Sequence, residues 1–298
     1  MERIVDTADG RFDTRLTGTG NVTFILDHGM MSSHYQWGWL RGELLKQGRV
    51  FEYSRLGYGK STRGKTKRLF TQQADELERV LALLGIKGPF VFIGHSLGAY
   101  ISLELGRRRP DETAGIVLLD PSHPEVDAEL PNWYERTQEE WNRFLYVLSH
   151  VRPLAWLIPD DLGARMFTSL PEADRIPMWR NMARKNHWRG TLDEWQAVEA
   201  NNQHVLEVVE HITPPVLVLS ASDWAGGMPE NWLNPELTKR INAAHERFAA
   251  SLPDAEFHVI PDTNHYTIAG FSEEAATTIV RLIRNAFLNK SDSWIPFP

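Results

Sequence analysis

The sequence contains no cysteine among its 298 residues. This absence excludes disulfide bonds, thiolate metal sites, iron–sulfur clusters and a cysteine nucleophile. Long apolar runs are also missing: the longest, such as PFVFIG and GIVLLD, have the length of a strand, whereas a membrane helix needs roughly 20 residues. The first ten residues, MERIVDTADG, lack the pattern of a signal peptide. We therefore expect a soluble, cytoplasmic protein without a membrane partner.

Basic residues are too few to give the chain a positive charge. Lysine and arginine number 32 against 39 aspartate and glutamate residues, which leaves a formal net charge of -7. This balance disfavours binding to nucleic acid or to anionic lipid. Neither an H-E-x-x-H motif nor a calcium-type carboxylate loop is present, so we expect no metal and no cofactor.

Apolar segments of strand length alternate with segments of helix length through most of the chain. The expected strands are 22–27, 50–53, 90–93, 116–119, 216–219 and 257–260. The expected helices are 35–46, 71–84, 97–109, 235–252 and 272–289. This alternation predicts an α/β protein with a mostly parallel, twisted sheet and helices on both faces.

The alternation stops after the strand that ends at Asp120. Residues 122–211 show no convincing strand, and we expect them to form a helical cap inserted into a core of residues 1–121 and 212–298. This segment holds six tryptophans, namely Trp133, Trp141, Trp156, Trp179, Trp188 and Trp195. Most should pack the cap helices, but one or two could line an apolar pocket, as could Trp37, Trp39 and Trp224.

The pentapeptide Gly94-His95-Ser96-Leu97-Gly98 carries the strongest functional signal. It follows an expected strand and opens an expected helix, which is the setting of a nucleophile elbow. The sharp turn strains the backbone at Ser96 and lifts its hydroxyl clear of the sheet. The flanking glycines leave room for neighbouring chain, and the helix N-terminus stabilises negative charge.

With this motif in view, the sequence resembles the α/β-hydrolase family over essentially its whole length. The resemblance also rests on the His28-Gly29 turn, the loop 56–61 (LGYGKS), the strand end LVLSASD and Asn264-His265. Ser54 is a departure, because many family members carry aspartate there. The resemblance implies the order serine, acid, histidine along the chain, with Ser96 as nucleophile and His265 as base.

Two aspartates end expected strands and could orient His265. Asp223 follows VLVLSAS at the position that the family usually uses, and we favour it. Asp120 is the alternative acid, since some related enzymes place theirs one strand after the elbow. The resemblance also implies an oxyanion hole formed by the backbone N–H groups of Met30 and Leu97.

These residues predict a serine hydrolase, most simply a carboxylesterase, that acts on a small-molecule ester or similar acyl substrate with an apolar or aromatic moiety. Carbon–carbon bond hydrolysis by the same triad is an alternative, and a ligand-binding protein with little turnover is another. Ser54–Ser61 (SRLGYGKS) imitates a phosphate-binding loop, but its first glycine and the helix after Lys60 are missing.

Overall fold

The computed structural model describes the chain except for residues 1, 65–66, 151–157, 225, 227–234 and 290–298. One sheet of eight strands forms its centre, in the order β1-β2-β4-β3-β5-β6-β7-β8. The strands are β1 (Glu2–Asp6), β2 (Arg11–Thr17), β3 (Thr23–Asp27), β4 (Arg49–Ser54), β5 (Phe90–His95), β6 (Thr113–Leu119), β7 (Val216–Ala221) and β8 (Ala255–Ile260). All neighbours from β4 to β8 pair in parallel, while β1–β2 and β2–β4 pair antiparallel.

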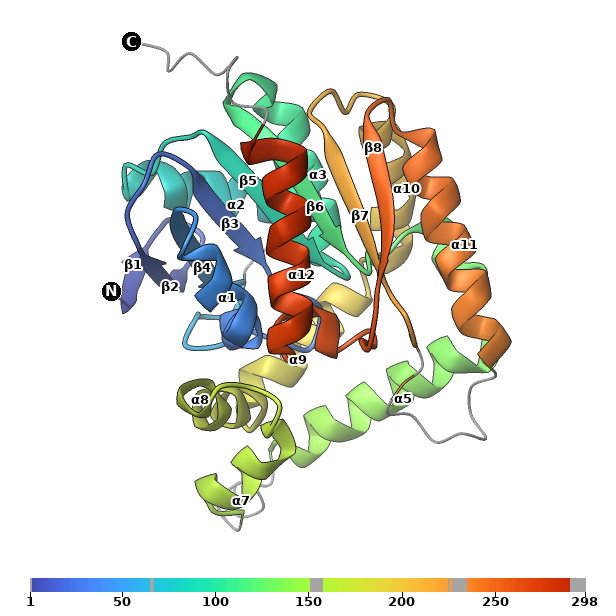
Figure 1. Cartoon of the computed structure of the whole chain (residues 1–298). Coiled ribbons are helices and arrows are strands. Elements are labelled where there is room, and N and C mark those ends of the chain that lie inside the picture. Colours follow the sequence, from blue (N-terminus) through green and yellow to red (C-terminus); the bar gives the residue numbers. More distant parts are fainter. Residues whose placement is uncertain (1, 65–66, 151–157, 225, 227–234, 290–298) are drawn as a thin grey trace.

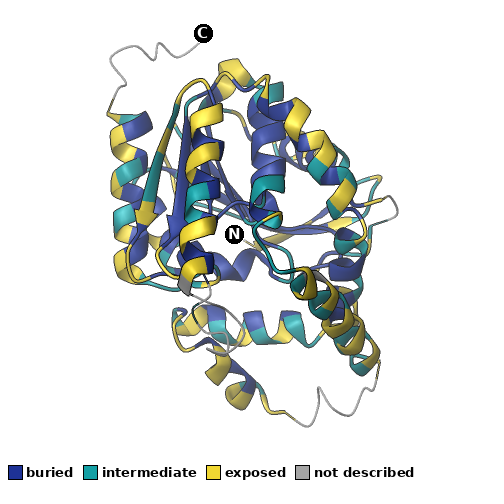
Figure 2. Cartoon of the chain, turned by 90° about the vertical axis from the view of Figure 1, so that its right-hand side faces the viewer, coloured by how far each residue is buried: buried dark blue, intermediate teal, exposed yellow. Residues whose placement is uncertain are grey.

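Helices cover both faces of this sheet (Figure 1). One face carries α1 (Gly38–Leu44) and α12 (Glu273–Ile283), and the other carries α2 (Phe70–Leu83), α3 (Gly98–Arg108), α10 (Val198–Val209) and α11 (Pro235–Ser251). The side chains of β5 show why both faces are covered, because successive residues of a strand point to opposite sides. Phe92 packs into one apolar cluster, while Ile93 packs into the other. The middle strands are accordingly buried between helical layers, whereas β1 and β8 at the edges of the sheet are more exposed (Figure 2).

The chain between β6 and β7 is helical where the structure describes it. Its helices are α4 (Pro124–Asp127), α5 (Asn132–Leu148), α7 (Asp160–Ala164), α8 (Glu172–Met182), α9 (Lys185–Trp195) and α10. In Figure 1, α5, α8 and α9 lie below the sheet, beyond the carboxyl ends of the parallel strands. Loops at that edge therefore face these helices. Ligands of open parallel sheets bind at this same edge.

Short helical turns complete the described chain. They are η1 (His34–Trp37), η2 (Pro110–Glu112), η3 (Arg165–Phe167), η4 (Thr267–Ala269) and the π-helical turn η5 (Arg284–Leu288). No helix among the described residues is long and apolar enough to cross a membrane.

Candidate active site

Ser96 lies on the turn between β5 and α3, and its backbone has a φ of +52°. Left-handed backbone is strained for a residue with a Cβ, so the surrounding chain must hold it in place. The flanking glycines explain how the turn closes. A Cβ on Gly98 would collide with the carbonyl of Asp27, and one on Gly94 would collide with the carbonyl of Gly98. The predicted strand–serine–helix turn is therefore present, with the serine partly exposed.

The His265 ring belongs to the loop after β8 and pairs with an aspartate at the end of β6. Its Nδ1–H donates to Oδ2 of Asp120 at 2.5 Å. With Nδ1 protonated, the neutral ring leaves Nε2 as an acceptor. Although the two residues are 145 positions apart, they meet because both strands end at the same edge of the sheet.

The structure does not support the preference for Asp223 as the acid that orients His265. Asp223 follows β7 and is exposed, and its backbone N–H donates to the carbonyl of Thr263. The alternative acid, Asp120, which is 1% exposed, accepts the hydrogen bond from His265 Nδ1–H. The sequence could not separate the two, since both aspartates end apolar strands. Their side-chain directions depend on the turn that follows each strand.

The turn at Asp120 directs its carboxylate inward. Its φ is +45°, and its Oδ1 accepts a hydrogen bond from the backbone N–H of Ala221 at 2.9 Å. Burial alone raises the pKa of this carboxyl group. The hydrogen bond and charge interaction with His265, together with the Ala221 amide, outweigh burial and lower the pKa of Asp120 to about 2. Asp120 is therefore ionised at neutral pH.

His95 connects the serine turn to the loop that carries His265. Its Nε2 lies 2.7 Å from the carbonyl oxygen of His265, and its Nδ1 lies 3.4 Å from Nε2 of Gln36. Burial, followed by the nearby His265, lowers the pKa of His95 to about 3. A neutral ring that donates from Nε2 and accepts at Nδ1 satisfies both contacts.

Met30 and Leu97, whose amides the resemblance assigns to an oxyanion hole, both line the cavity beside Ser96. Neither amide donates to an acceptor among the described residues. Arg55 holds the loop before Met30, because its guanidinium donates to the carbonyls of His28 and Gly29. These contacts fix the peptide planes next to the Met30 amide.

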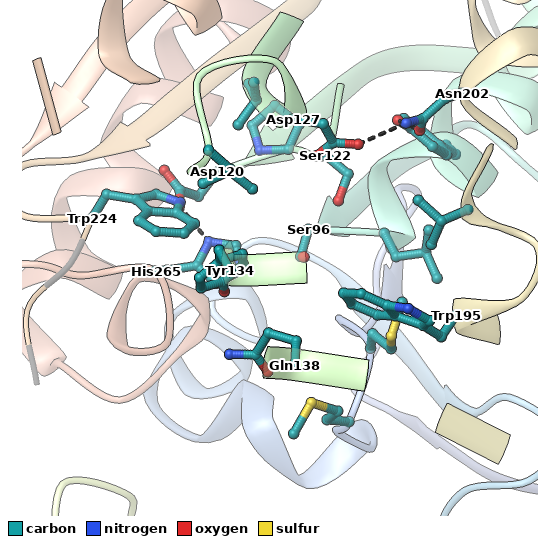
Figure 3. Close-up of a pocket in the computed structure, with 18 of the residues that line it drawn as sticks. Ser96, Asp120, Ser122, Asp127, Tyr134, Gln138, Trp195, Asn202, Trp224 and His265 are labelled. Carbon is teal, nitrogen blue, oxygen red and sulfur yellow. Dashed lines mark hydrogen bonds and ion pairs between the residues drawn. The ribbon is translucent and has the colours of Figure 1, made fainter. Parts of the chain in front are cut away.

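A cavity of about 430 Å³ joins these groups. Figure 3 shows Ser96 in its middle, with His265 and Asp120 on one side and Trp195 on the other. The Ser96 hydroxyl and the His265 ring share the cavity without a hydrogen bond between them; in unliganded enzymes such contacts often tighten only when substrate binds.

Aromatic and apolar side chains form most of the cavity wall. Of the tryptophans singled out above, Trp195 and Trp224 line it, while Trp37 is in the core and Trp156 lies outside the described residues. Polar groups are also present, namely Ser122, Asp127, Gln138, Glu199 and Asn202. Within the described chain, no group of histidine, aspartate and glutamate side chains is arranged to hold a metal ion.

Two residues near Asp120 have no counterpart in the sequence analysis. Ser220 in β7 and His245 in α11 are both fully buried, and the Ser220 hydroxyl lies 3.4 Å from Asp120 Oδ1. No motif marks either residue. His245 lies in an amphipathic helix, where only the three-dimensional contact distinguishes it from a packing residue.

Comparisons with known proteins agree with this arrangement. The sequence profile described as "Alpha/beta hydrolase family" matches residues 24–280. The chain is 33% identical over 105 residues to the uncharacterized protein YqjL of Bacillus subtilis, a match of 35% of this chain and 42% of that protein. It is 29% identical over 205 residues to the putative carbamate hydrolase RutD of Yersinia enterocolitica, covering 67% of this chain and 70% of the relative.

A solved structure extends the likeness to nearly the whole fold. The thermophilic esterase of Thermogutta terrifontis superposes with a TM-score of 0.64 at 20% identity, over 96% of this chain and 99% of that chain. By sequence, the chain spans less than half the length of the first curated relatives that it matches, at 42% and 34%.

Proposed function

Since this chain belongs to the alpha/beta hydrolase family, we propose that it is a serine hydrolase that cleaves carboxylic esters or similar acyl compounds. The family membership supports hydrolase activity. One observation carries the finer proposal: a strained serine and an aspartate-bound imidazole face the same cavity.

The proposed reaction begins when Ser96 attacks the substrate carbonyl. His265 Nε2 takes the Ser96 proton, and Asp120 stabilises the resulting imidazolium through Nδ1–H. The amides of Met30 and Leu97 bind the oxyanion. His265 then protonates the departing alcohol, which leaves an acyl group on Ser96. Water activated by His265 releases the acid and restores the serine.

The wall of the cavity supports an apolar or aromatic moiety in the substrate. Trp195 from α9 and Trp224 after β7 bring indole rings to the space beside Ser96, and Met30 and Met31 add flexible thioether side chains. Rings bury large apolar areas, so an ester with an aromatic or branched group gains more from this wall than a small acetate does.

A fluorophosphonate probe tests the nucleophile without knowledge of the natural substrate. We expect labelling of the wild type, none in Ser96→Ala, and normal labelling in Ser251→Ala, a serine at the end of α11 remote from the cavity. A panel of p-nitrophenyl esters beside a vinylogous diketone then separates ester from carbon–carbon cleavage. Equal labelling of the wild type and Ser96→Ala would contradict the proposal.

A further inference from the structure

The carboxylate of Asp120 lies between two histidines. Oδ2 accepts from His265 at 2.5 Å, while Oδ1 faces the buried side of the molecule. There, the ring of His245 approaches Oδ1 to 3.8 Å, with the Ser220 hydroxyl at 3.4 Å. His245 and Ser220 do not line the cavity. They contact the candidate acid from behind.

His245 reaches both the side chain and the backbone of the Asp120 turn. Its Nε2 lies 2.9 Å from the carbonyl oxygen of Pro121, the residue directly after Asp120. Its Nδ1 lies 2.7 Å from the Ser220 hydroxyl. A carbonyl oxygen can only accept, so Nε2 carries a proton. In the neutral ring Nδ1 then accepts from Ser220.

Ser220 has one proton and several acceptors around it. Besides His245, Oδ1 of Asn242 lies 2.6 Å from its hydroxyl and Asp120 Oδ1 lies at the longer 3.4 Å. When the proton goes to His245, the Asn242 amide satisfies the hydroxyl by turning its N–H₂ toward it. The Asp120 carboxylate then accepts its hydrogen bonds from the Ala221 amide and from His265.

We propose that His245, acting with Ser220, is a positioning residue that fixes the Asp120–Pro121 turn so that Oδ2 stays directed at His265. The inference rests on the proposed function, because it assigns His245 to the same catalytic machinery. A left-handed aspartate needs such support, since its φ of +45° is maintained only where neighbouring contacts hold it. The chain supplies them from α11 and β7.

The buried setting of His245 favours a neutral ring. Burial is the main cause that lowers its pKa, and His265 acts in the same direction. Asp120 and the Pro121 carbonyl oppose this lowering. His123 is a further titratable neighbour, and its own pKa is lowered to about 4, by burial first. Neutral His245 places no positive charge beside Asp120 that would compete with His265.

The experiment replaces each contact and follows the pH profile of kcat/KM. In His245→Leu and in Ser220→Ala we expect kcat to fall about tenfold, as for the loss of a hydrogen bond near a charged group, with KM unchanged because neither residue touches the cavity. The apparent pKa of the acid limb should fall, because the His265 imidazolium loses part of its carboxylate partner. His258→Leu is the matched control and should behave as wild type, because His258 is a partly exposed histidine in the edge strand β8 and does not line the cavity.

A second measurement needs no turnover. The short His265–Asp120 hydrogen bond should give a low-field proton resonance in the NMR spectrum of the wild type, which disappears in Asp120→Asn. We expect this resonance to broaden or shift in His245→Leu and in Ser220→Ala. Adding His245→Leu to Asp120→Asn should cost little further activity, because both changes act through one carboxylate.

Two results would overturn the proposal. One is an unchanged acid limb and an unchanged low-field resonance in correctly folded His245→Leu or Ser220→Ala. The other is a loss in the double variant equal to the product of the single losses. If wild-type Ser96 is neither labelled nor active, the proposed function fails instead, and the resonance still decides whether His245 positions Asp120.

Discussion

The ring of His95, directly before Ser96, donates from Nε2 to the backbone carbonyl of His265 at 2.7 Å. The serine turn and the histidine loop are 170 residues apart, and this bond joins them through a main-chain atom. The two rings lie 5.0 Å apart. Neutral at working pH, His95 can fix the loop without placing a charge beside the His265 ring.

Replacing His95 with phenylalanine should therefore impair the reaction rather than substrate binding. We expect kcat to fall about tenfold, as for one lost hydrogen bond in the site, while KM changes little. The rate of fluorophosphonate labelling at Ser96 should fall in parallel, since labelling also needs the base in place. His258→Phe serves as the control. A normal labelling rate in His95→Phe would show that the loop holds its position without this bond.

The choice between the two candidate acids gives a second test. Asp120→Asn should lower kcat by about 10³- to 10⁴-fold, because the imidazolium loses its counter-charge and the ring loses its tautomer. Asp223→Asn should retain activity within a few-fold, since Asp223 is exposed and is not bonded to His265. Steady-state kinetics on one p-nitrophenyl ester measures both variants. If Asp223→Asn lowered kcat more than Asp120→Asn, Asp223 would be the acid that acts with His265.

Local features of the fold were predictable from the sequence, and the family resemblance is confirmed. The segment Gly94–Gly98 was identified because its constraints are local: a strand, a tight turn and a helix in immediate succession. The parallel core was predictable for the same reason, since buried strands are short apolar runs. The first two strands were missed, because ERIVD and RFDTRLT are polar and pair antiparallel at the edge of the sheet.

The partner of His265 could not be predicted, because it depends on contacts between distant segments. Asp120 and Asp223 look alike in sequence, because each ends an apolar strand. They differ in the turn that follows: Asp120 has a φ of +45°, and its carboxylate accepts a hydrogen bond from the Ala221 amide. The contact of His245 with the Pro121 carbonyl is of the same long-range kind, so the sequence does not indicate it either. The bounds of the cap, 122–211, remain a prediction.

A buried ion pair between Arg55 and Glu194 connects the candidate oxyanion loop to helix α9. Arg55 Nε donates to Glu194 Oε1 at 2.7 Å, and both side chains are 1% exposed. Without Glu194, the buried Arg55 guanidinium keeps Asp27 as a carboxylate partner but loses the two oxygens of Glu194. Since breaking a buried pair is costly, Glu194→Gln should lower the free energy of unfolding by about 3 kcal/mol. Urea denaturation measures this change.

The adjacent residue in α9 provides a control for that prediction. Asp193 pairs with Arg63 and Arg189, whose side chains are 52% and 34% exposed, and such surface pairs contribute at most about 1 kcal/mol each. Asp193→Asn should thus unfold near the wild-type urea concentration. Equal losses in the two variants would mean that the buried pair adds nothing beyond an ordinary surface contact.

His187 in α9 should make stability depend on pH. Its side chain is fully buried, with Nδ1 3.0 Å from Nδ2 of Asn181, and burial lowers the pKa of His187 to about 3. The unfolded chain, with a histidine pKa near 6.5, binds a proton that the folded protein excludes. The part of the free energy of unfolding that depends on His187 is therefore fully present above about pH 6.5. It falls by about 1.4 kcal/mol per pH unit as the pH falls toward 3.

Replacing His187 with glutamine should remove this dependence. Urea unfolding at several values between pH 6 and pH 4 should show a slope of free energy against pH that is smaller by about one proton than in the wild type. His211→Gln, an exposed histidine after α10, should leave the slope unchanged. A wild-type slope in His187→Gln would mean that the folded protein already admits a proton at His187 above pH 4, and that burial of this ring does not exclude charge.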